Sequence, residues 1–204
     1  MFFEATSDAI TARVHLARRN TLRVLPTCSQ NQLFGRDAVP LELRNAHSDA
    51  GSFELFSGMG HGGEDIFQGQ FGLTIFDLTD TNALRGTVER AIVHLYSCDC
   101  GRVLGSDLVK HGAAAFIGYN APVSVPTDQR LVNEFVKVAG VIDSSILNGD
   151  SAMVTKMKAD AEFFIIDASL RGHASLATPR DVARFRQNHK AMVGPWMSQT
   201  YGIY

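Results

Sequence analysis

A histidine and a cysteine each follow an apolar run that has the length of a β-strand. His61 lies in a glycine cluster, GMGHGG, directly after the run at residues 53–57. Cys98 follows the continuous apolar run at residues 91–96. The carboxyl ends of parallel strands meet at one edge of an open α/β sheet, where such folds place their sites. Because a thiol needs a nearby base or cation to act as a nucleophile, we expect His61 and Cys98 to form a dyad at that edge.

The glycine cluster also matches the G-x-G-x-x-G pattern of dinucleotide-binding folds. Asp77 even stands where such folds place a ribose-binding acid. That pattern works only where a helix follows the glycines and directs its N-terminus at the phosphates. Only residues 64–70 separate the cluster from the next expected strand, whereas a helical crossover needs about 10–12 residues. We therefore expect a loop or hairpin there, and nucleotide binding remains the less favoured alternative.

The composition is that of an ordinary globular domain. Of the 204 residues 45% are hydrophobic and 20% are charged, and the net charge is -2. Nucleic-acid binders usually carry a basic excess, and no apolar run approaches the roughly 18 residues of a membrane span. The N-terminus lacks the basic start of a signal peptide, and an odd number of cysteines (Cys28, Cys98 and Cys100) suits a reducing compartment. We expect a cytoplasmic protein that binds neither nucleic acid nor membrane.

The apolar patterning predicts one α/β domain over residues 1–204. Strands are expected at residues 21–25, 53–57, 71–78, 91–96 and 113–119. Helices are expected at residues 7–19, 82–89, 101–111, 128–138 and 151–160, and Ser7 or Asp8 is expected to cap the first of them. A helical turn is expected from Pro40, and a last helix follows a capping box at Thr178. Residues 162–167 fit a strand or a buried helix extension. The strand–helix–strand order of residues 91–119 is typical of a parallel βαβ unit.

The two chemical stretches, FELFSGMGHGG and AIVHLYSCDCG, together resemble the caspase-like cysteine peptidases. That superfamily includes caspases, metacaspases, gingipain-type peptidases and bacterial CHAT domains. Its pattern is an apolar strand that ends in histidine-glycine and, a few tens of residues later, a second strand that ends in cysteine with a glycine shortly after. A helix and another apolar strand follow, as residues 101–111 and 113–119 do here. The resemblance covers about residues 53–125 and implies a three-layer αβα sandwich with a largely parallel sheet.

The resemblance also implies a mechanism, peptide hydrolysis without a cofactor. Cys98 would attack the scissile carbonyl while His61 first activates the thiol and then protonates the leaving amine. The backbone N–H groups of Gly62 and Cys98 would form the oxyanion hole. The implied partners are a protein or peptide substrate and, as a second partner, a regulatory protein. The substrate backbone would pair with the segment after the third strand, at Asn120, Ala121, Val123 and Ser124.

The chain departs from the family pattern in three places. A serine-glycine usually precedes the family's histidine directly, whereas Met59 and Gly60 intervene here. Members that cleave after Arg or Lys carry an acid two residues before the cysteine, whereas Tyr96 stands here, so a preference for basic residues does not carry over. A second cysteine follows at Cys100. We choose Cys98 as the nucleophile because it directly ends the apolar run and has a glycine three residues on, and we expect Cys100 in the core.

Other classes of function stay open besides the peptidase. A caspase-like fold could serve as a catalytically inert module that binds partners, in which case Cys98 would show ordinary thiol reactivity. Nucleotide binding at the glycine cluster is the remaining alternative. A metal site is not expected: His94, Cys98 and Cys100 would share one face of a strand, but no second Cys/His cluster supplies further ligands.

Overall fold

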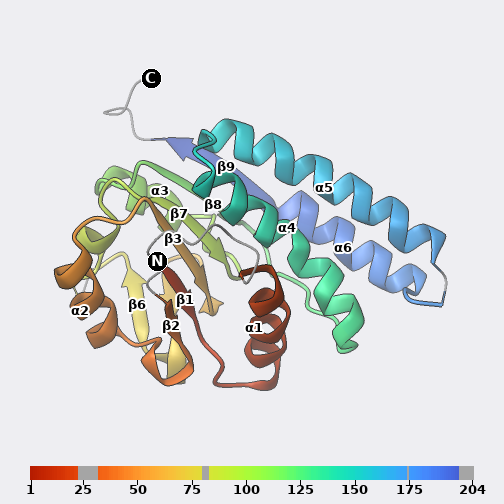
Figure 1. Cartoon of the computed structure of the whole chain (residues 1–204), viewed down its shortest axis with the longest axis horizontal. Helices are drawn as coiled ribbons and strands as arrows, with labels where there is room; N and C mark the ends of the chain where they lie inside the picture. The colour runs from red at the N-terminus through yellow and green to blue at the C-terminus, as the bar shows by residue number, and fades with distance from the viewer. Residues whose placement is uncertain (23–31, 80–82, 174, 198–204) are drawn as a thin grey trace.

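The computed structural model describes residues 1–22, 32–79, 83–173 and 175–197. Within these residues, six strands form one sheet in the order β2-β1-β3-β7-β8-β9 (Figure 1). The first five are parallel and β9 is antiparallel to β8. The strands are β1 (Phe2–Glu4), β2 (Gln32–Phe34), β3 (Leu55–Met59), β7 (Ile92–Tyr96), β8 (Ala115–Tyr119) and β9 (Met192–Met197).

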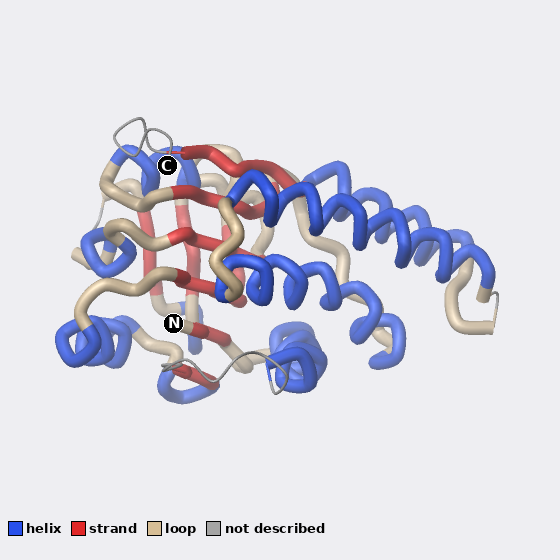
Figure 2. Tube along the Cα trace, turned by 45° about the horizontal axis from the view of Figure 1, so that its top comes forward, coloured by secondary structure: helices blue, strands red, loops and turns tan. Residues whose placement is uncertain are grey.

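Helices flank this sheet on both faces (Figure 2). One face packs against α1 (Ala9–Leu22), α4 (Gln129–Leu147), α5 (Ala152–Gly172) and α6 (Pro179–Ala191). The other packs against α2 (Pro40–Ala50), α3 (Leu104–Lys110) and a small antiparallel sheet of β4 (His61–Gly62), β5 (Ile66–Gln68) and β6 (Thr74–Asp77). The protein is therefore an α/β protein with a mostly parallel mixed sheet between helices.

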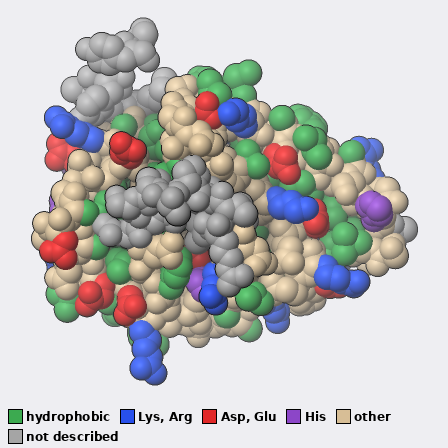
Figure 3. All heavy atoms as spheres, viewed as in Figure 1, with side chains coloured by type: hydrophobic (Ala, Val, Ile, Leu, Met, Phe, Trp, Pro, Cys, Tyr) green, Lys and Arg blue, Asp and Glu red, His purple; other side chains and the backbone are tan. Residues whose placement is uncertain are grey.

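Strand alternation sorts the side chains into the two cores. In β3, Leu55 and Met59 join the core under α1 and α4, whereas Phe56 joins the core under α3 and the small sheet. Both cores contain buried aromatic rings, which supply large apolar areas. On the outer face drawn in Figure 3, acidic and basic side chains are interspersed. No helix in the described parts of the chain is both long and apolar enough to cross a membrane.

Several predicted elements are confirmed. The apolar runs at residues 91–96 and 113–119 are β7 and β8, joined through α3 as a parallel βαβ unit. Asp8 caps α1 by accepting hydrogen bonds from the backbone N–H groups of Ile10 and Thr11. Thr178 and Asp181 form the expected capping box of α6. Residues 162–167 lie inside α5, so the helical alternative holds for them.

Other predicted elements are wrong or displaced. Thr21 and Leu22 end α1 rather than beginning a strand, and residues 23–25 lie outside the described residues. The helix expected at residues 82–89 is only a 3-10 turn, Arg85–Val88, and residue 82 is not described. The strand at residues 71–78 begins at Thr74 because a 3-10 turn, Gln70–Gly72, precedes it. The helix expected at residues 128–138 continues to Leu147.

The strand order reverses between β1 and β3. From β1 the chain crosses to β2 on one side, and β3 then pairs with β1 on the other side, from where the sheet continues through β7 and β8. Open α/β sheets bind ligands outside the carboxyl ends of the strands at such a reversal. The chain leaves β1 toward Asp8 and leaves β3 toward His61. This edge of the sheet is therefore where the fold favours a site.

Candidate functional site

His61 and Cys98 line the same cavity at the carboxyl edge of the sheet. Met59 and Tyr96, the last residues of β3 and β7, are partners in the parallel register. His61 and Cys98 each lie two residues beyond this pair, so both follow their strands at the same distance from the sheet edge. The cavity has a volume of about 110 Å³, and its other lining residues are Ile10, Thr11, Val14, Met59, Gly60, Tyr96, Ser97, Val123 and Val125.

Asp8 is a site residue that the sequence analysis treated only as a helix cap. Its Oδ2 lies 2.6 Å from His61 Nε2. Partial burial alone would raise the pKa of Asp8, but hydrogen bonds from His61 and from the amides and hydroxyl of the first helical turn lower it from 3.8 to about 2. Asp8 is thus a carboxylate that fixes the ring of His61. The available signal was an acid four residues after β1, but β1 itself was not predicted.

The contact with Asp8 divides the two ring nitrogens of His61 into different roles. A carboxylate next to Nε2 favours the tautomer that carries hydrogen on Nε2. Nδ1 then keeps a lone pair and can accept a proton. The side chain of His61 is 49% exposed, so the ring borders both the cavity and the solvent. An imidazole held in this way can serve as a general base for a group in the cavity.

The thiol of Cys98 is half-buried, and its sulfur accepts a hydrogen bond. The backbone N–H of Val123 donates to its Sγ at 3.3 Å. Burial raises the pKa of the Cys98 thiol, Val123 partly offsets this effect, and the negative charge of Asp99 adds to it. The thiol is therefore neutral near pH 7 in this arrangement. Nucleophilic chemistry at Cys98 requires a base that removes its proton.

Cys100 is a core residue, as predicted. Its side chain is fully buried, and its thiol donates to the carbonyl of Ile66 at 3.4 Å. Burial raises the pKa of the Cys100 thiol to about 12. Cys28, the third cysteine, lies outside the described residues. Of the two described cysteines, Cys98 is the one that reaches the cavity.

Gly62 lies directly against the segment that carries Cys98. Gly63 N–H donates to Ile66 O at 2.9 Å, which makes these two a hydrogen-bonded pair of the β4–β5 ladder. Pairs alternate along an antiparallel ladder, so Gly62, opposite Phe67, turns its N–H away from β5. A β-carbon on Gly62 would lie 2.6 Å from the carbonyl oxygen of Cys98. Gly62 thus packs closely on the Cys98 loop, although it does not line the cavity, and its role as an oxyanion donor stays a prediction.

The alternating glycines of the cluster serve close packing. A β-carbon on Gly58, Gly60 or Gly62 would collide with its neighbours. None of the three has a positive φ, so close approach, rather than the tight turn expected from the sequence, explains them. The expected hairpin is confirmed, because residues 64–70 contain β5 and no α-helix. Nucleotide binding at the glycine cluster would need a helix whose N-terminus faces the phosphates, and no α-helix directly follows the cluster.

A buried ionic network lies beneath the cavity. The guanidinium of Arg18 bonds Glu4 at 3.1 Å, Asp143 at 2.6 Å and the hydroxyl of Ser57 at 2.7 Å. His94 Nδ1 lies 2.8 Å from the other carboxylate oxygen of Asp143. Burial opposes the ionisation of Asp143, but Arg18 and His94 together lower its pKa below the usual value. The network is therefore held by mutual pairing of its charges.

This network is in register with the site. Glu4, Ser57 and His94 belong to β1, β3 and β7, and each lies four residues before Asp8, His61 and Cys98, respectively. Arg18 lies on α1 and Asp143 on α4, so the network joins three strands to two helices. Each strand that leads to a site residue thus also carries a buried polar side chain of the network, four residues before that site residue.

The segment after β8 borders the cavity, and several of its backbone groups have hydrogen-bond partners. The N–H of Asn120 donates to Ala191 O, and the carbonyl of Ala121 accepts from Asp99 N–H. Asn188 bonds both the N–H and the carbonyl of Ser124, each at 2.8 Å. Only Val123 among the four expected substrate contacts lines the cavity. The substrate-binding roles of Asn120, Ala121, Val123 and Ser124 stay predictions.

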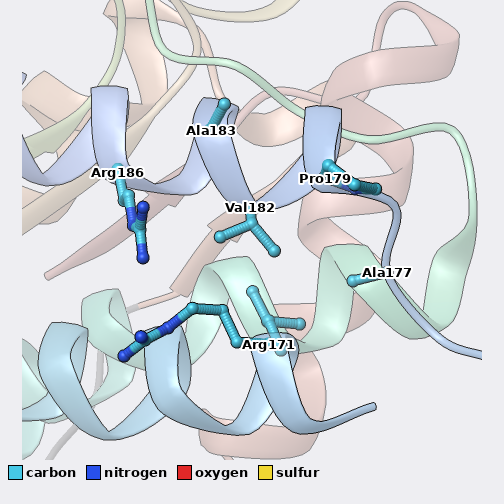
Figure 4. Close-up of a pocket in the computed structure, with 7 residues that line it drawn as sticks. Arg171, Ala177, Pro179, Val182, Ala183 and Arg186 are labelled. Atoms are coloured by element: carbon cyan, nitrogen blue, oxygen red, sulfur yellow. The ribbon is translucent and has the colours of Figure 1, made fainter. Parts of the chain in front are cut away.

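A larger cavity lies between α5 and α6. Its volume is about 330 Å³, and Arg171 and Arg186 extend into the space between the two helices (Figure 4). Asp167 pairs with both guanidinium groups. The lining residues include no cysteine, serine or histidine, so this cavity offers no nucleophile. Among the described residues, no three His, Cys, Asp or Glu side chains gather where they could hold a metal ion.

Comparison with known protein families, curated proteins and solved structures finds no match to this chain.

Proposed function

We propose that this chain is a cysteine peptidase with a three-layer, caspase-like αβα fold. The observation that carries the proposal is the cavity shared by Cys98 and His61, with Asp8 bonded to Nε2 of the imidazole. A nucleophile, a base and a group that orients the base are the three parts that acyl transfer uses. The sheet edge at the reversal of strand order supports the same assignment.

In the proposed reaction, His61 Nδ1 removes the proton of the Cys98 thiol as the sulfur attacks the scissile carbonyl. Asp8 stabilises the imidazolium that forms and keeps Nδ1 directed at the reacting atoms. His61 then protonates the leaving amine, and the C–N bond breaks. Water hydrolyses the resulting thioester, and the thiol regains its proton.

The N–H groups of Gly62 and Cys98 would stabilise the oxyanion of the tetrahedral intermediate. The close approach of Gly62 to the Cys98 carbonyl supports this pairing. Donors of this kind are each worth roughly 3–4 kcal/mol of the barrier. The neutral thiol of Cys98 fits a mechanism in which deprotonation accompanies attack rather than preceding it.

A peptide library tests the proposal. The purified chain is incubated with a mixture of synthetic peptides, and cleavage products are identified by mass spectrometry. We expect cleavage by the wild-type chain, none by Cys98→Ala, and retained cleavage by a folded Cys100→Ala variant. Full activity in Cys98→Ala, or no cleavage together with no preferential alkylation of Cys98, would overturn the proposal.

An inert interaction module is the second candidate. The observation that favours it is the effect of burial, which raises the pKa of the Cys98 thiol as it does for an unreactive core cysteine. In that case alkylation of Cys98 would be slow and would not depend on His61. A His61→Ala variant that alkylates at the wild-type rate would support the inert module over the peptidase.

A further inference from the structure

We infer that the cavity beside Cys98 selects a neutral aliphatic side chain on the substrate residue whose carbonyl is attacked. This inference rests on the proposed peptidase function and adds its substrate class. Cys98 itself lines the cavity. A substrate side chain that fills the cavity therefore belongs to the residue whose carbonyl the thiol attacks. The residue at this position of the substrate is called P1 below.

The cavity walls are mostly apolar, and five of the lining side chains are aliphatic or a thioether. Ile10 and Val14 come from α1, Met59 comes from the end of β3, and Val123 and Val125 come from the segment after β8. No Asp, Glu, Lys or Arg lines the cavity. Transfer of an apolar side chain from water to such walls is favourable, whereas a charged side chain would lose its hydration without gaining a partner.

Asp8 and Arg18, which lie near the cavity, are already paired, and Asp99, whose charge acts on the Cys98 thiol, does not line the cavity. Asp8 is bonded to His61 and to the first turn of α1. Arg18 interacts electrostatically with Tyr96, but it is fully buried and bonded to Glu4 and Asp143. A basic P1 side chain would need a free acid here, and an acidic one would need a free cation. The described residues of the cavity supply neither.

Tyr96 contributes a neutral side chain to the cavity next to Cys98. It stands two residues before Cys98 and lines the cavity while being almost completely buried. Burial raises the pKa of the Tyr96 hydroxyl far above its usual value, so this side chain stays uncharged. Among the described residues, its hydroxyl has no hydrogen-bond partner. Tyr96, like Thr11 and Ser97, thus gives the cavity a neutral hydroxyl and no charge.

The size of the cavity favours a small side chain. Its volume is about 110 Å³. A cavity of about 150 Å³ is large enough for benzene. A valine or leucine side chain therefore fits, and the indole of tryptophan does not. We expect P1 valine and leucine to be preferred over arginine, aspartate and tryptophan.

Peptidyl acyloxymethyl ketones that differ only in P1 test this directly, because they alkylate a reactive catalytic thiol. Probes with P1 valine, leucine, arginine, aspartate and tryptophan are reacted with the full chain, and the Cys98 adduct is measured by peptide mass. We expect the valine and leucine probes to react with rate constants at least tenfold higher than those of the other three. The same order is expected in kcat/KM for matched fluorogenic peptides.

A pair of α1 variants ties the preference to the cavity. Ile10 and Leu16 are both 51% exposed, but only Ile10 lines the cavity. Ile10→Glu places a carboxylate at the cavity in the first turn of α1, where negative charge favours the helix. We expect Ile10→Glu to raise the arginine-to-leucine rate ratio at least tenfold. Leu16→Glu should leave the ratio unchanged.

The outcomes separate this inference from the proposed function. If no probe modifies Cys98 and no peptide is cleaved, the peptidase proposal fails, and the inference fails with it. If Cys98 reacts but the arginine, aspartate or tryptophan probe is as fast as the leucine probe, only the inference is overturned. An unchanged ratio in Ile10→Glu, with Cys98 still reactive, would likewise show that P1 binds elsewhere.

Discussion

The contact between Gly62 and the Cys98 loop provides a sharp test of the site geometry. In Gly62→Ala, the new β-carbon would lie 2.6 Å from the carbonyl oxygen of Cys98 and 2.5 Å from Cys100 Sγ. It would lie closer still to the hydroxyl of Ser97. Gly62 does not have a positive φ, so alanine is compatible with the backbone conformation, and the collision is the only cost.

The size of the effect follows from the overlap. Ordinary contact begins at 3.4 Å, so Gly62 and the Cys98 peptide must separate by about 0.8 Å. A misplacement of about 1 Å at reacting groups costs about 10²-fold in rate. Both residues carry the proposed oxyanion donors, so we expect kcat/KM to fall by about 10²-fold. Overpacking of this kind costs about 1–3 kcal/mol of stability, which lowers Tm by several degrees and leaves the chain folded at 25 °C.

Gly63→Ala is the matched control in the same hairpin. Its β-carbon would meet only the tip of Ile66 at 3.3 Å and Asp65 at 3.8 Å. We expect wild-type Tm within about one degree and kcat/KM within about threefold. Activity is measured on a cleaved peptide, Tm by thermal unfolding, and folding by circular dichroism. Wild-type Tm and kcat/KM in Gly62→Ala would refute the packing of β4 against the Cys98 loop.

Four further predictions concern the charged groups and the thiols. Asp8→Asn should lower kcat by about 10²–10⁴-fold, because the amide loses the charge that orients His61. Since its pKa is lowered to about 2, Asp8 stabilises the wild-type fold above pH 3.8; urea unfolding should show this contribution lost as pH falls toward 2, and absent from Asp8→Asn. Arg18→Met should destabilise by about 3–5 kcal/mol in urea unfolding, and a loss under 1 kcal/mol would contradict the network. Iodoacetamide at pH 7 should modify Cys98 before the fully buried Cys100; the reverse order would assign the wrong nucleophile.

The central strands could be predicted because their side chains are buried on both faces. β7 and β8 read as continuous apolar runs in the sequence, and the residues that follow β3 and β7 were therefore placed at one edge. β1 could not be found in the same way, since it has only three residues and ends in Glu4. Glu4 is fully buried because Arg18 and His15 pair with it, and sequence patterning does not show such pairing. Without β1, the position of Asp8 beside His61 could not be predicted.

The length of α5 was missed for a different reason. Its amphipathic pattern is interrupted by Phe164 and Ile165, which are 66% and 62% exposed. Consecutive apolar residues on a solvent-facing helix resemble a buried strand, so residues 162–167 stayed ambiguous. The neighbours Phe163 and Ile166 are buried against the sheet-side core and decide in favour of the helix. Tertiary packing, rather than local pattern, sets where α5 ends.

The buried network explains how strand ends can hold a precise site. Residues that follow the last hydrogen bond of a strand depend on that strand for their position. Ser57 and His94 are partners in the parallel register of β3 and β7, so the network holds these two strands together. Arg18 ties α1, which Asp8 caps, to the same layer. A change at Arg18 would therefore alter the position of α1 relative to β3, and with it the contact between Asp8 and His61. Because those groups share one network, their effects on activity should be non-additive in double-mutant cycles.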